Sequence, residues 1–330
     1  SDNLRGMLEW LQISLTQVPS DRVRKMSMTS RITATPTSIE IADLDLKLDS
    51  SHVTGGAAIA LPGAGQDKAA FGVGLAIDQL NLDAYLPPSA GGGTAKKKGG
   101  GLPLDALAPL AGFDANVELR VGKLTMNNQQ AQGVHIDGTL NGGALTLRDF
   151  SVKEFAGGKG TLSGTVSDLA GKPRFDTKFD VSAKDASKAL EFAGFGKQKN
   201  LGALKLAGSV AGGAQDVAYD VTFALSGIGA SGSAKGKAAG LGAGIPRIDT
   251  DFDLKAKDAG PLFGLAGFSA ADGSKLGAVT LNGTAASGED DLTYNVALAM
   301  AGIGGQGKFD GKILGLSGTP QVNTKLDFSA

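Results

Sequence analysis

An internal repeat constrains the fold of this chain more than any other feature of its sequence. The segment FDTKFDVSA, which begins at Phe175, returns as IDTDFDLKA from Ile248 and as VNTKLDFSA from Val322, 73 and then 74 residues further on. A second stretch repeats at nearly the same spacing, because VAYDVTFAL from Val217 corresponds to LTYNVALAM from Leu292. Repeats of this length are typical of architectures that stack one supersecondary unit on the next. The sequence therefore predicts a repeating structural unit of about 73 residues.

The repeated segments have the alternation of β-strands with one apolar face. In the segment from Phe175, every second residue is apolar or β-branched, and Asp176, Lys178 and Asp180 stand between them. A period of two is typical of antiparallel sheets that expose one face to water. We therefore predict a mainly β fold built from repetitive antiparallel strands.

Helices are predicted to be short and to lie between the repeats. Asp185–Phe195 and Asp258–Phe268 follow equivalent strands, and Leu80–Leu86 and Leu104–Leu110 resemble earlier copies. One short helix per repeat cannot cover the apolar face of several strands. That face needs a second sheet, closure of the sheet on itself, or a curved trough with an apolar lumen. The residues alone leave a packed sandwich and an open trough as equal alternatives.

The strand alternation changes phase at two places, Ala42–Asp43 and Arg148–Asp149. Such a change predicts a β-bulge or a tight bend. Each is followed by a double glycine, Gly55–Gly56 and Gly157–Gly158, and then by another strand. Glycine makes up 51 of the 330 residues, which fits a sheet that curls sharply.

The segments outside the repeat complete the expected organisation. Residues 1–19 are predicted to form an amphipathic helix that ends at Pro19, because the apolar residues fall at helical spacing. Residues 20–86 are predicted to form a first β-groove unit, 87–103 a flexible loop rich in Gly, Pro and Lys, and 104–330 the repeating β units. The chain opens on serine rather than methionine, and we expect it to be a piece of a longer or processed protein.

The composition excludes several classes of function. Lys and Arg number 32 against 33 Asp and Glu. The chain therefore has no excess of positive charge that would bind nucleic acid or attract the chain to anionic lipid. There is no cysteine, which excludes disulfides, thiolate catalysis and Cys-based metal sites. The absence of thiols suits a bacterial periplasm but fits other compartments too.

The motifs that suggest enzyme chemistry lack the neighbouring residues and elements that such chemistry needs. Gly227–Gly232 and Gly302–Gly307 match the dinucleotide fingerprint G-x-G-x-x-G, but no helical pattern follows either copy. Asp249 and its neighbours at positions 251 and 253 have the spacing of a calcium loop without its glycine and glutamate. His52 and His135 are isolated, each beside glycines. We predict no catalytic residue, no cofactor and no metal, and therefore a protein that is not an enzyme.

Four stretches of the chain are similar to one protein family. They are the amphipathic opening that ends in Val18-Pro19, the segment IEIADLDLKL from Ile39, the segment LNLDAYLP from Leu80, and residues 145–158 with the Gly-Thr-Val strand that follows. On these residues, which extend over nearly the whole chain, the sequence resembles the AsmA family of bacterial envelope proteins, relatives of TamB.

The resemblance implies a fold and a function. It implies an elongated, curved, taco-like β-groove with an apolar inside, projecting into the periplasm from an inner-membrane anchor outside this segment. Phospholipid acyl chains would be held in the groove and moved toward the outer membrane, in a bridge-like transfer that serves outer-membrane biogenesis. The family has no catalytic motif to carry over, and partner proteins are not implied.

Candidate lining residues are the apolar members of the predicted strands. They are Phe175, Phe179, Tyr219, Val221, Phe223, Leu225, Phe252, Tyr294, Val296 and Leu298. The alternative is a periplasmic structural or assembly factor for the outer membrane, with a packed interior and no lipid. A third reading, part of a membrane barrel or an adhesin, is disfavoured because one Trp and three Tyr do not supply aromatic girdles.

Overall fold

The structure is a computed structural model. It describes residues 19, 22–23, 25–63, 67–85, 104–126, 128–192, 201–241, 246–265 and 273–329. The fold of these residues is mainly β, with mostly antiparallel strands, open rather than closed, and accompanied by few short helices. The expected mainly β class is thereby confirmed. Of the amphipathic helix predicted over residues 1–19 only Pro19 is described, and the loop predicted over 87–103 lies outside the described residues.

The chain divides into two compact units, the first of which holds eight strands. They are β1 (Met26–Ala34), β2 (Ser38–Leu48), β3 (Ser51–Ala60), β4 (Ala70–Asn81), β5 (Asp114–Met126), β6 (Gln129–Asn141), β7 (Ala144–Phe155) and β8 (Gly158–Ser167). Each pairs with the next in antiparallel fashion, except β4 and β5, which are parallel. The parallel pair was not expected. It is possible because residues 82–113 are long enough to return the chain to the end where β4 began.

Two of the predicted short helices fall in this connection. They are the 3₁₀ helices η1 (Leu82–Ala84) and η2 (Leu104–Gly112). Both differ from the α-helices of the second unit, and Pro109 lies inside η2, where it cannot donate a backbone hydrogen bond.

The second unit holds nine strands, and every neighbouring pair is antiparallel. The strands are β9 (Arg174–Ala183), β10 (Leu204–Gly212), β11 (Asp216–Leu225), β12 (Ala230–Ala239), β13 (Arg247–Ala256), β14 (Val279–Ser287), β15 (Asp291–Met300), β16 (Gly305–Leu314) and β17 (Gln321–Ser329). The helices are α2 (Ala186–Phe192), α3 (Ala259–Leu265) and the 3₁₀ helix η3 (Ala301–Ile303).

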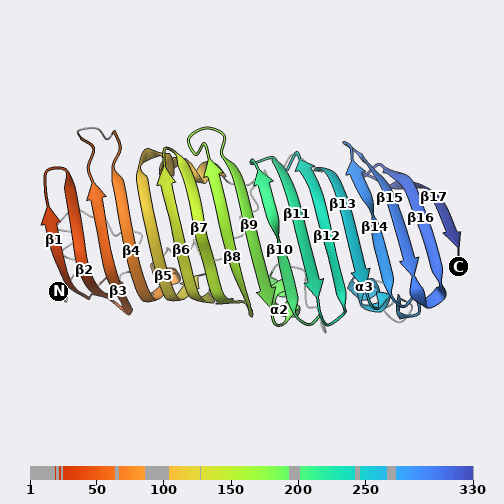
Figure 1. Ribbon diagram of the computed structural model, residues 1–330, viewed down its shortest axis with the longest axis horizontal. Helices are drawn as coiled ribbons and strands as arrows, with labels where there is room; N and C mark the ends of the chain where they lie inside the picture. The colour runs from red at the N-terminus through yellow and green to blue at the C-terminus, as the bar shows by residue number, and fades with distance from the viewer. Residues whose placement is uncertain are drawn as a thin grey trace. The chain divides into compact units, whose positions relative to one another are not determined.

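The sequence repeat corresponds to four strands and one short helix. The three aligned segments are β9, β13 and β17, and α2 and α3 follow the first two at the same end of the strands (Figure 1). Both helices are capped alike, because a side-chain oxygen of Asp185 accepts from the Ser187 amide (2.9 Å) and one of Asp258 from the Gly260 amide (2.8 Å). The Ser187 amide lowers the pKa of Asp185. The repeated Lys-Asp-Ala triplet is thus a capping signal.

Both predicted bulges are present. The register of β2 against β3 skips from Ile41 to Leu44, and Asp43 has a positive φ of 51°. The register of β7 against β8 skips at 148–149 in the same way. The two double glycines differ, however: Gly157 precedes β8 in a turn, whereas Gly55 and Gly56 lie inside β3, opposite the first bulge. A Cβ on Gly56 would lie 2.9 Å from the Ile41 carbonyl oxygen, so glycine is required where the bulged strand approaches.

Central glycines recur in alternate strands of the second unit. A Cβ on Gly208, Gly236 or Gly283 would lie only 2.1–2.3 Å from a carbonyl oxygen of the following strand. Gly236 and Gly283 stand in β12 and β14, and Gly311 of β16 has the same environment at 2.4 Å. Such close backbone approach marks a bend that only glycine permits. The bends therefore repeat every second strand, as expected for a sheet that curves.

The buried core of the second unit lies at the helix-bearing ends of the strands. Its buried residues are Ala186, Leu201, Leu225, Ile228, Ala230 and Ala256, with Leu204, Leu262 and Val279 packed against them. In the first unit a cluster of Val121, Ala131 and Val134 packs with neighbouring apolar side chains, among them Ile77 and Phe150. Within each unit the described strands follow one another in a single ladder, so a separate second sheet is not part of the described structure. The packed-sandwich alternative is therefore wrong for these residues.

Candidate functional site

All ten candidate lining residues lie on one face of the second unit. Residues that are directly opposite in neighbouring strands share a face, and the printed registers connect three rows across β9–β17. The central row is Phe179, Gly208, Val221, Ala234, Phe252, Gly283, Val296, Phe309 and Leu326. The tyrosine row is Thr177, Val210, Tyr219, Gly236, Thr250, Ala285, Tyr294, Gly311 and Thr324. The leucine row is Val181, Leu206, Phe223, Gly232, Leu254, Leu281, Leu298, Gly307 and Phe328.

We call these three rows the apolar face. Of the candidates outside them, Phe175 lies two residues before Thr177 and shares the face. Leu225 lies beyond the leucine row, where it is 9% exposed and packs in the core with Ala186 of α2. Leu225 therefore has little surface left for a ligand. The other nine candidates are half-buried.

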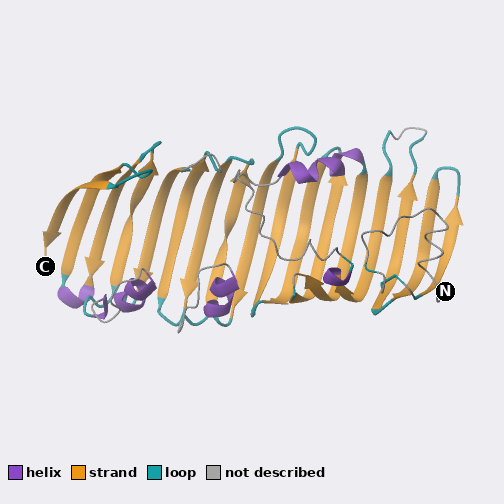
Figure 2. Cartoon of the chain, turned by 180° about the vertical axis from the view of Figure 1, so that it is seen from behind, coloured by secondary structure: helices purple, strands orange, loops and turns teal. Residues whose placement is uncertain are grey.

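The centre of the apolar face is partly open to solvent. Seen from behind, α2 and α3 lie at the ends of the strands rather than over their centres (Figure 2). Phe179, Val221, Phe252 and Val296 of the central row are all half-buried, and Leu326 is 58% exposed.

Glycines on this face accommodate aromatic rings from the neighbouring strand. A Cβ on Gly232 would lie 2.7 Å from the ring of Phe223, its partner in the ladder. In the same way, a Cβ on Gly311 would meet the hydroxyl of Tyr294 at 2.9 Å, and one on Gly307 the ring of Phe328 at 3.0 Å. The rings thus lie across the adjacent strand, an arrangement that makes the face continuous from strand to strand.

Four polar side chains of the apolar face are hydrogen-bonded within the protein. The hydroxyl of Thr177 donates to the Val210 carbonyl (3.0 Å), and that of Thr250 to the Lys235 carbonyl (3.3 Å). The hydroxyls of Tyr294 and Thr324 are hydrogen-bonded to each other. Because these groups have internal partners, a molecule that covers the face does not need to supply hydrogen-bond partners for them.

The opposite face of the same strands is charged. Lys235 pairs with Asp220 at 3.1 Å, and Lys255 with Asp253 at 3.3 Å. These side chains are largely exposed, so the pairs contribute little to stability. A cavity of about 320 Å³ lies among mostly polar-face residues of β14–β17, including Asn282. It is therefore not a cavity of the apolar face.

The motifs rejected as nucleotide or calcium sites are elements of the sheet. Residues 226–229 form the turn before β12, and η3 with Gly304 (φ 62°) forms the equivalent turn before β16. A strand rather than a helix follows each turn, so the pyrophosphate-binding helix terminus is missing from both. Asp249 and Asp251 lie exposed along β13 rather than in a loop. The structural interpretation of these motifs is confirmed.

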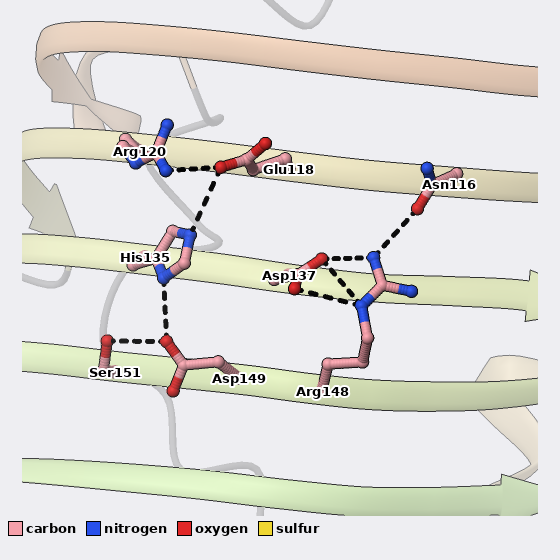
Figure 3. Close-up of polar contacts among 8 residues, drawn as sticks. All are labelled: Asn116, Glu118, Arg120, His135, Asp137, Arg148, Asp149 and Ser151. Atoms are coloured by element: carbon pink, nitrogen blue, oxygen red, sulfur yellow. Dashed lines mark hydrogen bonds and ion pairs between the residues drawn. The ribbon is translucent and has the colours of Figure 1, made fainter.

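His135 is not isolated, contrary to the expectation from sequence. It lies in β6, and its Nδ1 is 2.7 Å from a carboxylate oxygen of Asp149 on β7 (Figure 3). Its Nε2 is 3.9 Å from Glu118 on β5, which also pairs with Arg120. No direct signal of this network is present in the sequence, because its members come from three strands and meet only through their register.

A second part of the network joins Arg148 to Asp137 and Asn116 (Figure 3). The hydrogen bond from Arg148 lowers the pKa of Asp137, and the same contact raises the pKa of Arg148. Every carboxylate of the network thus faces a guanidinium or an imidazole. Asn116 also borders a cavity of about 370 Å³ lined mainly by small residues such as Ala58 and Gly72.

The network does not assemble a catalytic triad. The hydroxyl of Ser151 donates to Asp149 (3.2 Å) rather than to the imidazole, so the imidazole is not placed to take its proton. The Nε2 of His135 has no hydrogen-bond partner within the described residues. Among those residues, no group of three or more His, Cys, Asp or Glu side chains is arranged to hold a metal ion.

Comparisons with known proteins give this chain no relative. No family model, no curated protein and no solved structure matches it. In the described part of the chain, no helix has the length and apolarity needed to cross a membrane.

Proposed function

We propose that this chain binds the acyl chains of phospholipid on the apolar face of its second unit and lets them move along it. It would act without catalysis, as a bridge-like lipid-transfer segment of the bacterial envelope. The periplasmic location and the tether to the inner membrane come from the resemblance to the AsmA family and are part of the same proposal. The observation that carries it is the half-buried apolar face, which crosses the nine strands of one ladder and is partly open to solvent.

The dimensions of the face suit an acyl chain. Neighbouring strands are about 4.8 Å apart, so a row from β9 to β17 is about 38 Å long. The acyl chains of one leaflet span about 15 Å, half of the hydrocarbon core. A single row is therefore long enough for roughly two acyl chains placed end to end.

Burial of hydrocarbon supplies the binding energy. Each fully buried CH₂ contributes about 0.8 kcal/mol, so a chain that buries half of its surface gains about 0.4 kcal/mol for each CH₂. This attraction is not directional. Most of the face is apolar, and the hydroxyls of Thr177, Thr250, Tyr294 and Thr324 are hydrogen-bonded within the protein, so few positions along a row can hold the lipid by a polar contact. Such a uniform surface permits sliding.

Photo-crosslinking at two adjacent positions of β15 tests this proposal. A photoreactive residue replaces Val296 on the apolar face or Asn295 on the polar face, and the protein is exposed to phospholipid vesicles. The proposal expects lipid adducts at position 296 and almost none at 295. Equal labelling at both positions, or none at either, contradicts it and favours an assembly factor that carries no lipid.

A further inference from the structure

Among the three rows of the apolar face, only the tyrosine row carries hydroxyl groups. The central row and the leucine row consist of Gly, Ala, Val, Leu and Phe alone. The residues with a hydroxyl are Thr177, Tyr219, Thr250, Tyr294 and Thr324. A lipid on this face therefore meets hydrogen-bonding side chains only along the tyrosine row.

The tyrosine of the second repeat has a partner within the protein. Tyr294 of β15 lies opposite Gly311 of β16, which in turn lies opposite Thr324 of β17. The hydroxyls of Tyr294 and Thr324 are hydrogen-bonded to each other, and the Tyr294 hydroxyl lies where a Cβ on Gly311 would be 2.9 Å away. Glycine in the middle strand thus lets the tyrosine reach the threonine two strands away.

The tyrosine of the preceding repeat occupies the equivalent place but has no such partner. Tyr219 of β11 is related to Thr250 of β13 by the same register. The Thr250 hydroxyl, however, lies at hydrogen-bond distance from backbone carbonyls, those of Lys235 (3.3 Å) and Asp251 (3.2 Å). Within the described part of the chain, the Tyr219 hydroxyl has no hydrogen-bond partner, and the residue is half-buried.

A hydroxyl without a protein partner discriminates between ligands that cover it. Water can reach the Tyr219 hydroxyl only while the face is uncovered, and hydrocarbon placed over it leaves the O–H group without an acceptor, at a cost in free energy. A ligand that brings an acceptor oxygen to this point avoids that cost. Tyr294 keeps its internal partner when the face is covered, so the same discrimination is not expected there.

We propose that Tyr219 binds the ester group of a lipid on the apolar face, its hydroxyl donating a hydrogen bond to an ester carbonyl oxygen. The ester carbonyl is the acceptor that adjoins the acyl chains, whereas the phosphate is charged and is expensive to bring onto an apolar surface. The ligand class is therefore a lipid with ester-linked chains. This inference rests on the proposed function and deepens it, because it gives a lipid that slides along the face a preferred position at β11.

Photo-crosslinking with two lipids that differ only in how their chains are linked tests the proposal. The intact chain is exposed to vesicles with equal amounts of an ester-linked phosphatidylcholine and its ether-linked analogue, which lacks the carbonyl oxygens. A photoreactive residue replaces Val221, two residues from Tyr219, or Val296, two residues from Tyr294. Mass spectrometry gives the ratio of ester-linked to ether-linked adducts at each position.

The proposal expects about a fivefold excess of ester-linked adducts at position 221, the effect of one net hydrogen bond, and no excess at position 296. Tyr219→Phe removes a hydroxyl that has no protein partner and should abolish the excess at 221 without unfolding the chain. Thr324→Val removes the partner of Tyr294 and should create a similar excess at 296. Circular dichroism checks that each variant is folded.

The outcomes separate this inference from the function on which it rests. Equal ester-linked and ether-linked adducts at position 221 overturn the inference and leave lipid binding in place. An excess that Tyr219→Phe does not abolish also overturns it, because another group would then supply the preference. The same holds for a folded Thr324→Val chain without an excess at 296, because the freed Tyr294 hydroxyl would then fail to select the ester. An absence of adducts at both positions contradicts the proposed function itself, and this inference with it.

Discussion

Replacing Val221 with aspartate tests the apolar face near its centre. Val221 is half-buried on β11 and lies between Gly208 of β10 and Ala234 of β12. Because both neighbours are small, a carboxylate at this position has room and remains in contact with water when no lipid is bound. The substitution should therefore separate lipid binding from folding.

The two effects differ in size. A fully buried Val contributes about 1.5 kcal/mol or more, so the loss of this half-buried side chain should lower the free energy of unfolding by about 1 kcal/mol. A charge in contact with hydrocarbon costs about 2.5–3.5 kcal/mol. Since about 1.4 kcal/mol changes an equilibrium tenfold, lipid affinity should fall about 100-fold while the protein stays folded.

The assay is lipid extraction from purified protein, expressed per mole of chain that circular dichroism shows to be folded. Thr222→Asp is the matched control, because Thr222 is exposed on the opposite face of the same strand, and it should retain its lipid. A folded Val221→Asp variant with unchanged lipid content refutes the assignment of this face. Complete unfolding of the variant also refutes it, because position 221 would then be ordinary core.

Three other substitutions test the account of the fold. Gly236→Ala places a Cβ 2.1 Å from the Asp249 carbonyl oxygen and should lower the free energy of unfolding in urea by about 1–3 kcal/mol, whereas Gly74→Ala, with nothing within 4 Å, should leave it unchanged. Asp258→Ala removes the cap of α3 and should cost about 1 kcal/mol in thermal unfolding; an unchanged melting temperature would show that the cap is dispensable. Arg148→Gln should return the pKa of Asp137, which the hydrogen bond from Arg148 lowers, to the ordinary carboxyl value in an NMR titration. The stabilisation from this contact is present above that ordinary value and is lost as the pH falls through the lowered one. A variant in which Asp137 keeps its lowered pKa would contradict the assignment.

Local rules in the sequence predict much of this fold. Alternation of period two identifies the strands and their apolar face, and a change of phase locates the bulges at 42–43 and 148–149. The repeat predicts that β9, β13 and β17 are equivalent. These features depend on residues close together in the chain, and so they can be read without knowing the strand order.

Features that depend on strand order could not be predicted. The parallel pairing of β4 with β5 joins strands that are separated by more than 30 residues in the chain, and no local pattern in either strand specifies it. The partners of His135 come from β5 and β7 and meet only after register is established. Leu225 looks like a lining residue by parity, but α2 and its neighbours bury it at the strand end. In each case tertiary contacts decide the outcome.

Native mass spectrometry of the purified chain, followed by lipid extraction, tests the central claim most directly. The account predicts phospholipid that co-purifies at a reproducible stoichiometry and is lost in the Val221→Asp variant. A lipid-free mass, recorded under conditions that keep a known lipid carrier loaded, would contradict it and favour a protein whose apolar face serves assembly rather than lipid transfer.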